Sequence, residues 1–503
     1  MKIFTIAVIV TIANVCWSAS DTDPYLIPDT FVQESSEREV VLNDYVVGVP
    51  LWPAGMPDEA IQYSQDEWVE NRSGDLDEYG FNRAAHYVDK PSLMVLKSKS
   101  GGNAKPAVVI FPGGAFERVV LDKEGFAVAR WFQQFGITGI VVKYRTSEQY
   151  TNDTIFASIH ADAQRAISLV RARAAEWSID PNRIGIMGFS AGGFLAHSIL
   201  FDQGLGYHES YDAIGAVPFY PDFCCLTYAA WIPFHEPDEF TDDMAPTFLT
   251  GCRDDSYVDR TNYYAITGGL SSLGIDSEVL LFDSGGHGFG LGVNGGEVAT
   301  WPRALLAWLS QTGVMSEPNG PVTNSTSGDR YASIQCAIYG AEAGDTIVIE
   351  PGQYAEPLVL EQDLTVQSVD PNDPLYIGGT ILQGDLEDPV LTLSDNTAAC
   401  TVAGLTLRAG SVGISGTATQ ATIRNCRIMD NATHGLELFA GSNPYLNHCL
   451  ITANGQTGIT MHELGGRRAL LCEPVLENCV IVDNGTAGLV GGQPVINDSI
   501  VQE

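Results

Sequence analysis

A serine between two glycines is the first group in this sequence that could perform covalent chemistry. Ser190 lies in IGIMGFSAGGFLA, where an apolar run typical of a buried strand precedes it and a helical pattern follows. Gly188 and Gly192 flank it at the −2 and +2 positions, the spacing of a sharp strand-to-helix turn that exposes a serine hydroxyl. Such a hydroxyl becomes a nucleophile when a base activates it and a third group orients the base.

A histidine and an acid follow Ser190 in the chain order that this turn requires. His287 lies in EVLLFDSGGHGFG, where neighbouring glycines free the backbone after a strand-like run. The segment TFLTGCRDDSYVD places Asp254 and Asp255 directly after another such run. The D-x-x-V spacing to Val258 favours Asp255 as the acid of a Ser-Asp-His triad, and Asp254 remains the alternative.

Attack on a carbonyl also requires backbone donors for the oxyanion. One is expected to be the N–H of Ala191, the residue after the nucleophile. The other is expected in FPGGAF (111–116), where a strand-like run ends in adjacent glycines and the amide of Gly114 or Ala115 can face the substrate.

The segments before residue 316 alternate between strand-like and helix-like patterns. Short runs that are apolar throughout are typical of strands buried on both faces. These runs are AVVIF (107–111), TGIVVKY (138–144), IGIMG (184–188), IGAVPFY (214–220), TFLTG (247–251) and EVLLFD (278–283). With helical patterns between them, they predict an α/β fold, a parallel sheet with helices on both faces, whose strand ends carry the catalytic groups.

The second part of the chain is repetitive. Three segments align with one another: TIRNCRIMDNATHGLEL, YLNHCLITANGQTGITM and VLENCVIVDNGTAGLVG. A partial fourth copy begins with VINDSIVQE. Short strands with Gly and Asn turns at this period predict a β-solenoid in which like residues stack. One column is expected to contain Asn425, His448, Asn478 and Asp498, and the next, facing inward, Cys426, Cys449, Cys479 and Ser499.

The chain divides at SEPNGPVTNSTSGD, which is rich in Pro, Gly, Ser, Thr and Asn. We therefore expect a signal peptide at 1–20, a catalytic domain at 21–315, a linker at 316–328 and a β-solenoid domain at 329–503. The signal peptide is indicated by Lys2, the apolar run 3–15 and the small residues before a cleavage site near Ser20. The protein is then expected to be secreted, periplasmic or attached to the cell surface.

The net charge of −36 narrows the range of partners. Nucleic acids and anionic membranes bind clustered cations, which this chain lacks, so neither is expected as a partner. No segment suggests membrane insertion. Ten cysteines occur without a C-x-x-C pair, so a zinc site is not expected, and the vicinal pair Cys224-Cys225 is poorly suited to a disulfide.

Several motifs of the first domain resemble one known group of enzymes. They follow one another as in the secreted α/β-hydrolases that include acetylxylan and feruloyl esterases. The motifs are VPLWPAGMP, PSLMVL, FPGGAFERVVLDKEGFAVARWFQQFGITGIVVKYR, DAQRAISLVRARAAEWSIDPNRIGIMGFSAGGFLA, APTFLTGCRDDSYVD and GGHGFGLG. The resemblance implies the triad Ser190, Asp255 and His287, with Gly114, Ala115 and Ala191 as oxyanion donors. Ala115 stands where the group usually has a third glycine. Residues 222–240 do not align and lie where such enzymes often build a lid.

The second domain resembles right-handed parallel β-helices of the pectin-lyase type, most closely in YASIQCAIYGAEAGDTIVIEPGQY (331–354). Together the resemblances imply an exported serine esterase that removes acyl groups, above all acetyl, from a plant or algal polysaccharide such as xylan. The β-helix would serve for targeting or attachment, and no cofactor or metal is implied. The alternatives are a prolyl-oligopeptidase-like peptidase and a β-helix adhesion protein with an accessory hydrolase domain.

Overall fold

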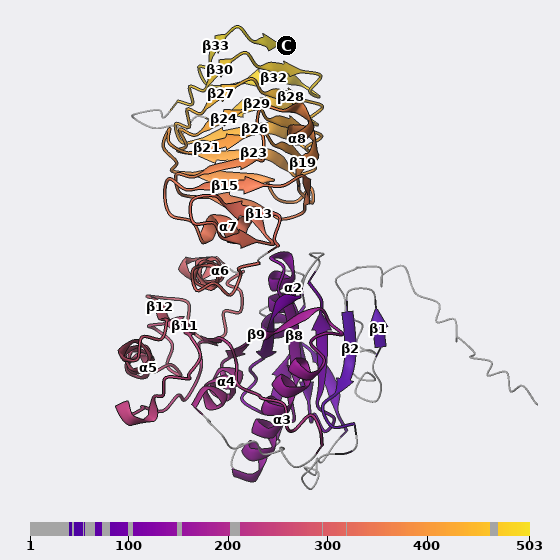
Figure 1. Ribbon diagram of the computed structural model, residues 1–503, viewed down its shortest axis with the longest axis vertical. Helices are drawn as coiled ribbons and strands as arrows, with labels where there is room; N and C mark the ends of the chain where they lie inside the picture. Colours follow the sequence, from indigo (N-terminus) through magenta and orange to yellow (C-terminus); the bar gives the residue numbers. More distant parts are fainter. Residues whose placement is uncertain are drawn as a thin grey trace, which may run out of the picture.

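The computed structural model describes residues 40–42, 45–53, 55, 66–72, 81–98, 104–147, 153–201, 212–293, 295–317, 319–462 and 471–502. The expected signal peptide and its cleavage site near Ser20 lie outside these residues. Two units follow one another along the chain: a sheet covered by helices, and a stack of short parallel strands (Figure 1). Within the described part of the chain, no helix combines the length and apolar character needed to cross a bilayer.

A nine-stranded sheet forms the centre of the first unit. In spatial order it consists of β1 (Val40–Leu42), β2 (Tyr45–Pro50), β5 (Ser92–Leu96), β8 (Thr138–Lys143), β6 (Lys105–Phe111), β9 (Ile179–Phe189), β10 (Cys224–Thr227), β11 (Thr247–Cys252) and β12 (Ser277–Phe282). The strands from β8 to β12 pair in parallel, whereas β1, β2, β5 and β8 are joined antiparallel. β5, β6, β8, β10 and β11 are buried at every residue, as expected of strands covered on both faces.

Helices cover this sheet. They are α2 (Ala127–Gln134), α3 (Asp153–Ala172), α4 (Ala191–Phe201), α5 (Arg260–Ser272) and α6 (Trp301–Gln311), with short helical turns η1 (Asp122–Phe126), η2 (Pro237–Glu239) and η3 (Glu297–Thr300). α3 and α4 pack on one another and on β9, α2 packs on β8, and α6 packs on β11. A small antiparallel sheet of β3 (Trp68–Asn71), β4 (Arg83–His86) and β7 (Arg118–Val120) lies beside η1. The predicted α/β class is confirmed.

One predicted strand is wrong. IGAVPFY (214–220) forms turns and irregular chain, and the strand of this region is β10, a few residues later. The apolar composition of 214–220 resembles a buried strand, but Pro218 can donate no ladder hydrogen bond. Cys224 and Cys225, by contrast, pair with both β9 and β11 inside the sheet. Part of the segment expected as a lid is therefore core.

The second unit is a β-helix of three sheets, in which the strands pair in parallel except at the start of the first sheet (Figure 1). The first sheet contains β14 (Arg330–Tyr331), β13 (Val322–Asn324), β15 (Thr346–Ile349), β18 (Thr365–Ser368), β21 (Thr401–Ala403), β24 (Thr422–Arg424), β27 (Tyr445–Asn447), β30 (Val475–Glu477) and β33 (Val495–Asn497). The second contains β16 (Gly352–Tyr354), β19 (Thr380–Gln383), β22 (Thr406–Arg408), β25 (Arg427–Met429), β28 (Leu450–Thr452), β31 (Val480–Val482) and β34 (Ile500–Val501). The third contains β17 (Leu358–Leu360), β20 (Leu391–Ser394), β23 (Val412–Thr417), β26 (His434–Phe439), β29 (Thr457–Met461) and β32 (Ala487–Val490). Two short helices, α7 (Ile334–Tyr339) and α8 (Pro374–Gly379), complete the unit.

The predicted columns have a structural cause. Asn425, His448, Asn478 and Asp498 all have left-handed backbones, with φ between 45° and 54°, where the chain turns from the first sheet to the second. Asn and Asp tolerate this conformation better than most residues. The cysteines that follow them are at most 2% exposed and point inward, and all nine described cysteines are free. A ladder of the buried Asn431 and Asn454 and the half-buried Asn484 joins successive coils through side-chain hydrogen bonds of 2.9 Å.

The expected linker, 316–328, is part of the β-helix. Its residues Val322–Asn324 form β13, which pairs antiparallel with β15. A strand of three residues within a Pro- and Gly-rich stretch is too short to produce a periodic pattern. The carboxylate of Glu317 lies 3.4 Å from the Lys105 ammonium and 3.7 Å from the Arg183 guanidinium. Helix α6 also packs on α7, so the two units share a continuous apolar core (Figure 1).

Candidate active site

Ser190 stands on the sharp turn between β9 and α4. Its φ is 52°, an unusual backbone for a residue with a side chain, which holds the hydroxyl away from the sheet. A Cβ on Gly188 would lie 2.1 Å from the carbonyl oxygen of Gly192, and one on Gly192 would lie 2.0 Å from that of Phe111. The turn therefore requires both glycines, because a side chain at either position would collide with the backbone, as their spacing around Ser190 predicts.

The structure brings Ser190, His287 and Asp255 together in one hydrogen-bonded chain. The hydroxyl Oγ of Ser190 lies 2.7 Å from Nε2 of His287, and Nδ1 of His287 lies 2.6 Å from Oδ2 of Asp255. The Asp255 side chain is fully buried, and its second oxygen accepts a hydrogen bond of 2.8 Å from the Tyr257 N–H. A carboxylate held in this way fixes the orientation of the imidazole and leaves Nε2 facing the serine.

Asp254 has a different position from its neighbour. Its carboxylate accepts hydrogen bonds from the backbone N–H groups of Gly286, at 2.9 Å, and Gly285, at 3.3 Å. These bonds, that from Gly286 above all, lower the pKa of Asp254. The side chain thus supports the glycine loop that carries His287, whereas Asp255 contacts the imidazole itself.

The expected oxyanion donors lie around the serine. Ala191 is the first residue of α4, so its N–H has no partner within the helix. Gly114 and Ala115 line the same cavity as Ser190 and His287. Ala115 adopts a φ of 57°, a left-handed backbone that glycine reaches without strain and that residues with a side chain rarely adopt.

Two buried residues that the sequence analysis missed, Glu124 and Tyr228, connect the loop before Ala115 with the loop that carries His287. Oε2 of Glu124 accepts a hydrogen bond of 2.8 Å from the Gly113 N–H, and its Oε1 accepts one of 2.9 Å from the Tyr228 hydroxyl. The Tyr228 hydroxyl in turn accepts a hydrogen bond of 3.1 Å from the Gly290 N–H. Burial and the Glu124 carboxylate raise the pKa of Tyr228 well above its usual value. These hydrogen bonds thereby fix the loop that contains Gly113 relative to the loop that contains Gly290 and His287.

A cavity of about 370 Å³ opens in front of the serine. Trp231 and Tyr257, 41% and 54% exposed, form part of its wall, and the Tyr257 ring lies 4.9 Å from that of His287. Exposed aromatic faces beside a nucleophile offer stacking surfaces for a substrate ring. Trp231 belongs to the segment 222–240, so this part of the expected lid does border the site.

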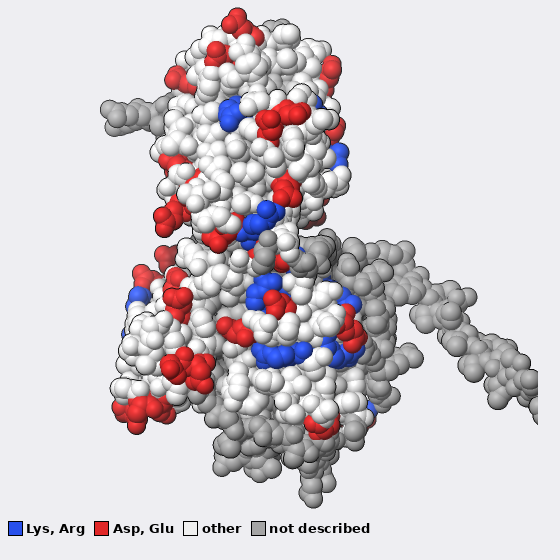
Figure 2. All heavy atoms as spheres, viewed as in Figure 1, with Lys and Arg blue, Asp and Glu red and all other residues white. Residues whose placement is uncertain are grey.

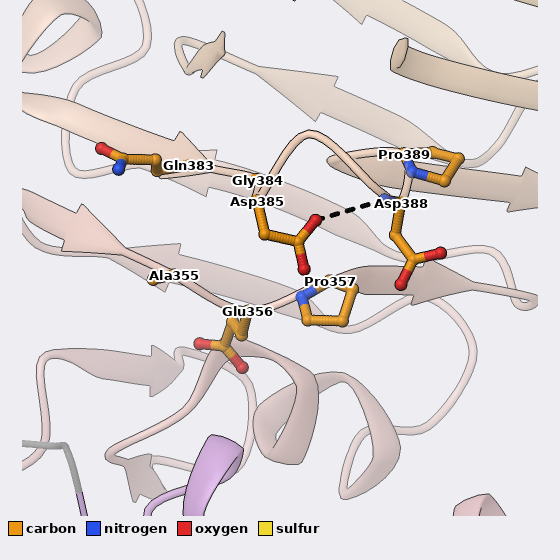
Figure 3. A pocket seen from close by; sticks show the side chains of 8 residues that line it. All are labelled: Ala355, Glu356, Pro357, Gln383, Gly384, Asp385, Asp388 and Pro389. Carbon is orange, nitrogen blue, oxygen red and sulfur yellow. Dashed lines mark hydrogen bonds between the residues drawn. The ribbon is translucent and has the colours of Figure 1, made fainter. Parts of the chain in front are cut away.

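A second, smaller hollow of about 70 Å³ lies in the β-helix (Figure 3). Two of its three carboxylates, those of Asp385 and Glu356, already have structural roles. Asp385 accepts a hydrogen bond from the backbone N–H of Asp388, as Figure 3 shows, and closes a turn. Glu356 is buried beneath α7, where its carboxylate accepts from the Ser333 hydroxyl at 2.5 Å and the Ile334 N–H at 2.8 Å. Across the described part of the chain, no three His, Cys, Asp or Glu side chains are grouped as metal ligands would be.

Comparisons with known proteins agree with the two units. Residues 93–204 match the family model BD-FAE, and residues 388–500 match the model for a right-handed β-helix region. An acetylxylan esterase of Xylanibacter ruminicola is 27% identical over 207 residues, which are 37% of this chain and 41% of that protein. An endo-1,4-β-xylanase B of Butyrivibrio fibrisolvens is 25% identical over 262 residues, 46% of this chain and 39% of that protein. This chain therefore spans about two fifths of each of these curated relatives.

A solved structure of an acetyl ester-xyloside bifunctional hydrolase from Caldicellulosiruptor lactoaceticus is also similar, with 25% identity and a TM-score of 0.39. The match covers 53% of this chain and 96% of that one.

Proposed function

We propose that this chain, which joins an α/β-hydrolase domain with a BD-FAE segment to a right-handed β-helix, is a serine esterase that removes acyl groups, chiefly acetyl, from a polysaccharide such as xylan. The observation that carries the proposal is the chain of hydrogen bonds from Ser190 through His287 to Asp255 at the edge of an open cavity.

The geometry supports a two-step acyl transfer. His287 Nε2 takes the proton of the Ser190 hydroxyl as Oγ attacks the ester carbonyl, and the oxyanion that forms accepts hydrogen bonds from the amides of Ala191 and the loop 114–115. The intermediate collapses to an acyl-serine, and the sugar oxygen leaves with the proton that His287 returns. A water molecule, deprotonated by His287, then releases the acid and restores the serine.

Two observations favour an acylated sugar as substrate. The cavity offers the aromatic faces of Trp231 and Tyr257 beside the nucleophile. The similar curated proteins are named as an acetylxylan esterase and a xylanase. An ester on a sugar ring would place its acyl group at Ser190 and its ring against these aromatic side chains.

The test is acetate release from acetylated xylan by the full chain and by Ser190→Ala. Ser198→Ala is a matched control, since Ser198 lies on the same helix and, among the described residues, its hydroxyl donates to the Phe194 carbonyl alone. We expect release by the wild type and the control, and none above background from Ser190→Ala. Hydrolysis of 4-nitrophenyl acetate without release from xylan would leave an esterase but refute the polysaccharide assignment. Cleavage of a prolyl peptide amide instead would favour a peptidase.

We also propose that the protein is exported and that the β-helix attaches it to its substrate or to a surface. The charged and apolar pattern of residues 1–20 supports export. N-terminal sequencing of the protein from its own cells should find a start near Ser20, and a mature chain that retains Met1 would refute export. Full-length Ser190→Ala should sediment with an insoluble polysaccharide, and its complete recovery in solution would count against attachment to that polymer.

A further inference from the structure

Cationic side chains outnumber acidic ones in the wall of the catalytic cavity. The chain has 62 acidic and 26 basic residues, and on the face seen in Figure 2 acidic side chains are spread over both units. Nevertheless, Arg72, Arg118 and Lys123 all line the cavity in front of Ser190. The acidic side chain in the cavity wall, Glu124, is already engaged by the Gly113 N–H and the Tyr228 hydroxyl.

Lys123 differs from the other buried lysines of the described chain. Lys105 is 4% exposed and pairs with Glu317, and Lys143 is fully buried and pairs with Glu67. Lys123 is 7% exposed, yet its ammonium has no carboxylate or hydrogen-bond partner among the described residues. Lys123 Nζ is not among the fully enclosed side-chain atoms that lack a partner in the described chain, so a largely buried stem carries an ammonium that reaches solvent at the cavity. Because no carboxylate of the described chain occupies this ammonium, it is available to a group of the ligand.

The two arginines fit the same ligand. Nε of Arg118 is buried and has no hydrogen-bond partner within the described chain. The arginine stem packs on the oxyanion loop, since a Cβ on Gly114 would lie 2.9 Å from Arg118 Cγ. Arg72 is half-buried at the end of β3. A planar guanidinium binds carboxylate and other oxyanion groups through parallel N–H donors, so these side chains complement the ammonium of Lys123.

We propose that Arg72, Arg118 and Lys123 form a subsite for an anionic oxygen group carried by the sugar whose ester is cleaved. The group is the carboxylate of a uronic acid or a sulfate ester, close enough to the scissile bond for both to occupy one cavity. The inference rests on the proposed esterase function and specifies its substrate as an acidic acylated polysaccharide. The acidic outer surface does not oppose this binding, because its field is screened within about 8 Å at physiological salt, whereas the cations contact the ligand directly.

Binding can be measured without catalysis. We would titrate Ser190→Ala with glucuronate, galacturonate, xylose and xylose sulfate by calorimetry at constant ionic strength. An acidic sugar should bind at least about tenfold more tightly than xylose, the factor expected of charge-assisted hydrogen bonds. A preference for uronates identifies the carboxylate, and a preference for the sulfated sugar identifies the sulfate. Equal binding of charged and neutral sugars overturns the proposal, whether or not the wild type is an esterase.

Variants of the cations test the assignment. Lys123→Gln and Arg118→Gln, each combined with Ser190→Ala, should reduce the ratio of acidic to neutral sugar affinity at least about tenfold, and Lys123→Arg should restore it. Lys97→Gln is the matched control, because Lys97 is a half-exposed lysine outside the cavity and its loss should leave the ratio unchanged.

The unfolding temperature of Lys123→Gln shows whether a change in sugar binding comes from the lost charge or from a damaged fold. Since Lys123 has no partner to lose among the described residues, Lys123→Gln should unfold at about the temperature of its parent or above it. A variant that folds and keeps the full preference for acidic sugars overturns the proposal. So does a lowered unfolding temperature with an unchanged preference, because Lys123 would then be structural.

Discussion

Replacement of Asp255 by Asn is expected to remove most of the activity while preserving the fold. Asp255 accepts two hydrogen bonds, from His287 Nδ1 and from the Tyr257 N–H. Asn is nearly the same size but has only one oxygen. If that oxygen remains with the Tyr257 N–H, the amide NH₂ faces Nδ1 and the imidazole must carry its proton on Nε2. The nitrogen that faces Ser190 then donates a hydrogen bond and cannot take the serine proton.

The size of this effect can be derived from the same geometry. Inversion of the imidazole tautomer in a serine triad lowers kcat about 10⁴-fold, a value known from another serine hydrolase. This corresponds to about 5.4 kcal/mol in the activation free energy. KM should change little, because Asp255 is buried behind His287 and is not part of the cavity wall.

Asp254→Asn provides the matched control, with the same chemical change at the adjacent residue. Asp254 contacts only the backbone of the loop before His287 in the described structure. The oxygen of Asn can still accept the 2.9 Å hydrogen bond from the Gly286 N–H, and only the longer bond of 3.3 Å from Gly285, which uses the other carboxylate oxygen, is lost. We expect kcat within about tenfold of the wild type. The assay is steady-state hydrolysis of 4-nitrophenyl acetate, with thermal unfolding of each variant to establish that it folds. A folded Asp255→Asn protein that keeps more than a tenth of wild-type kcat, or a larger loss in Asp254→Asn, refutes the assignment.

Three further outcomes follow from the buried polar groups. Tyr228→Phe leaves the Gly290 N–H and Oε1 of Glu124 without partners, so the free energy of unfolding in urea should fall by about 2–3 kcal/mol, and an unchanged value would contradict a role in joining the loops. Asn454→Ala breaks the hydrogen bonds to Asn431 and Asn484, so the free energy of unfolding in urea should fall by about 2–3 kcal/mol. An unchanged free energy would mean that the stacking of the coils does not depend on this ladder. Burial, followed by the nearby His235, lowers the pKa of His197 to about 3. The unfolded chain therefore binds a proton below pH 6.5 that the folded chain excludes until about pH 3, so the protein should lose about 2 kcal/mol of stability between pH 6.5 and 5 through this group. His197→Phe should reduce that dependence in thermal unfolding at both pH values, and a dependence equal to that of the wild type would refute it.

Much of the site was recognisable in the sequence because it is built from local turns. The glycines around Ser190 and those beside His287 reflect backbone conformations that the neighbouring residues impose, and such constraints leave a pattern in a short stretch of chain. The preference for Asp255 over Asp254 also came from local spacing, and the structure places Asp255 alone of the two against the imidazole. The stacked cysteines were visible because the coils repeat.

Other features needed contacts between distant segments. The strand β10 was missed because its four residues have no pattern of their own, and their burial comes from β9 and β11 on either side. The short strand β13 was read as linker for the same reason, since its pairing with β15 is what makes it a strand.

The sequence by itself therefore determined the fold class, the repeat and the identities of the candidate triad, because each depends on periodicity or on a tight turn. Only the tertiary structure decided what surrounds the triad. Glu124 and Tyr228 are 104 residues apart and meet through one hydrogen bond. Lys123 became notable only when its ammonium was found in the cavity without the carboxylate that the other buried lysines have. The sequence shows which residues can carry a charge. Whether such a charge is paired within the protein or available to a ligand depends on which distant segments fold beside it.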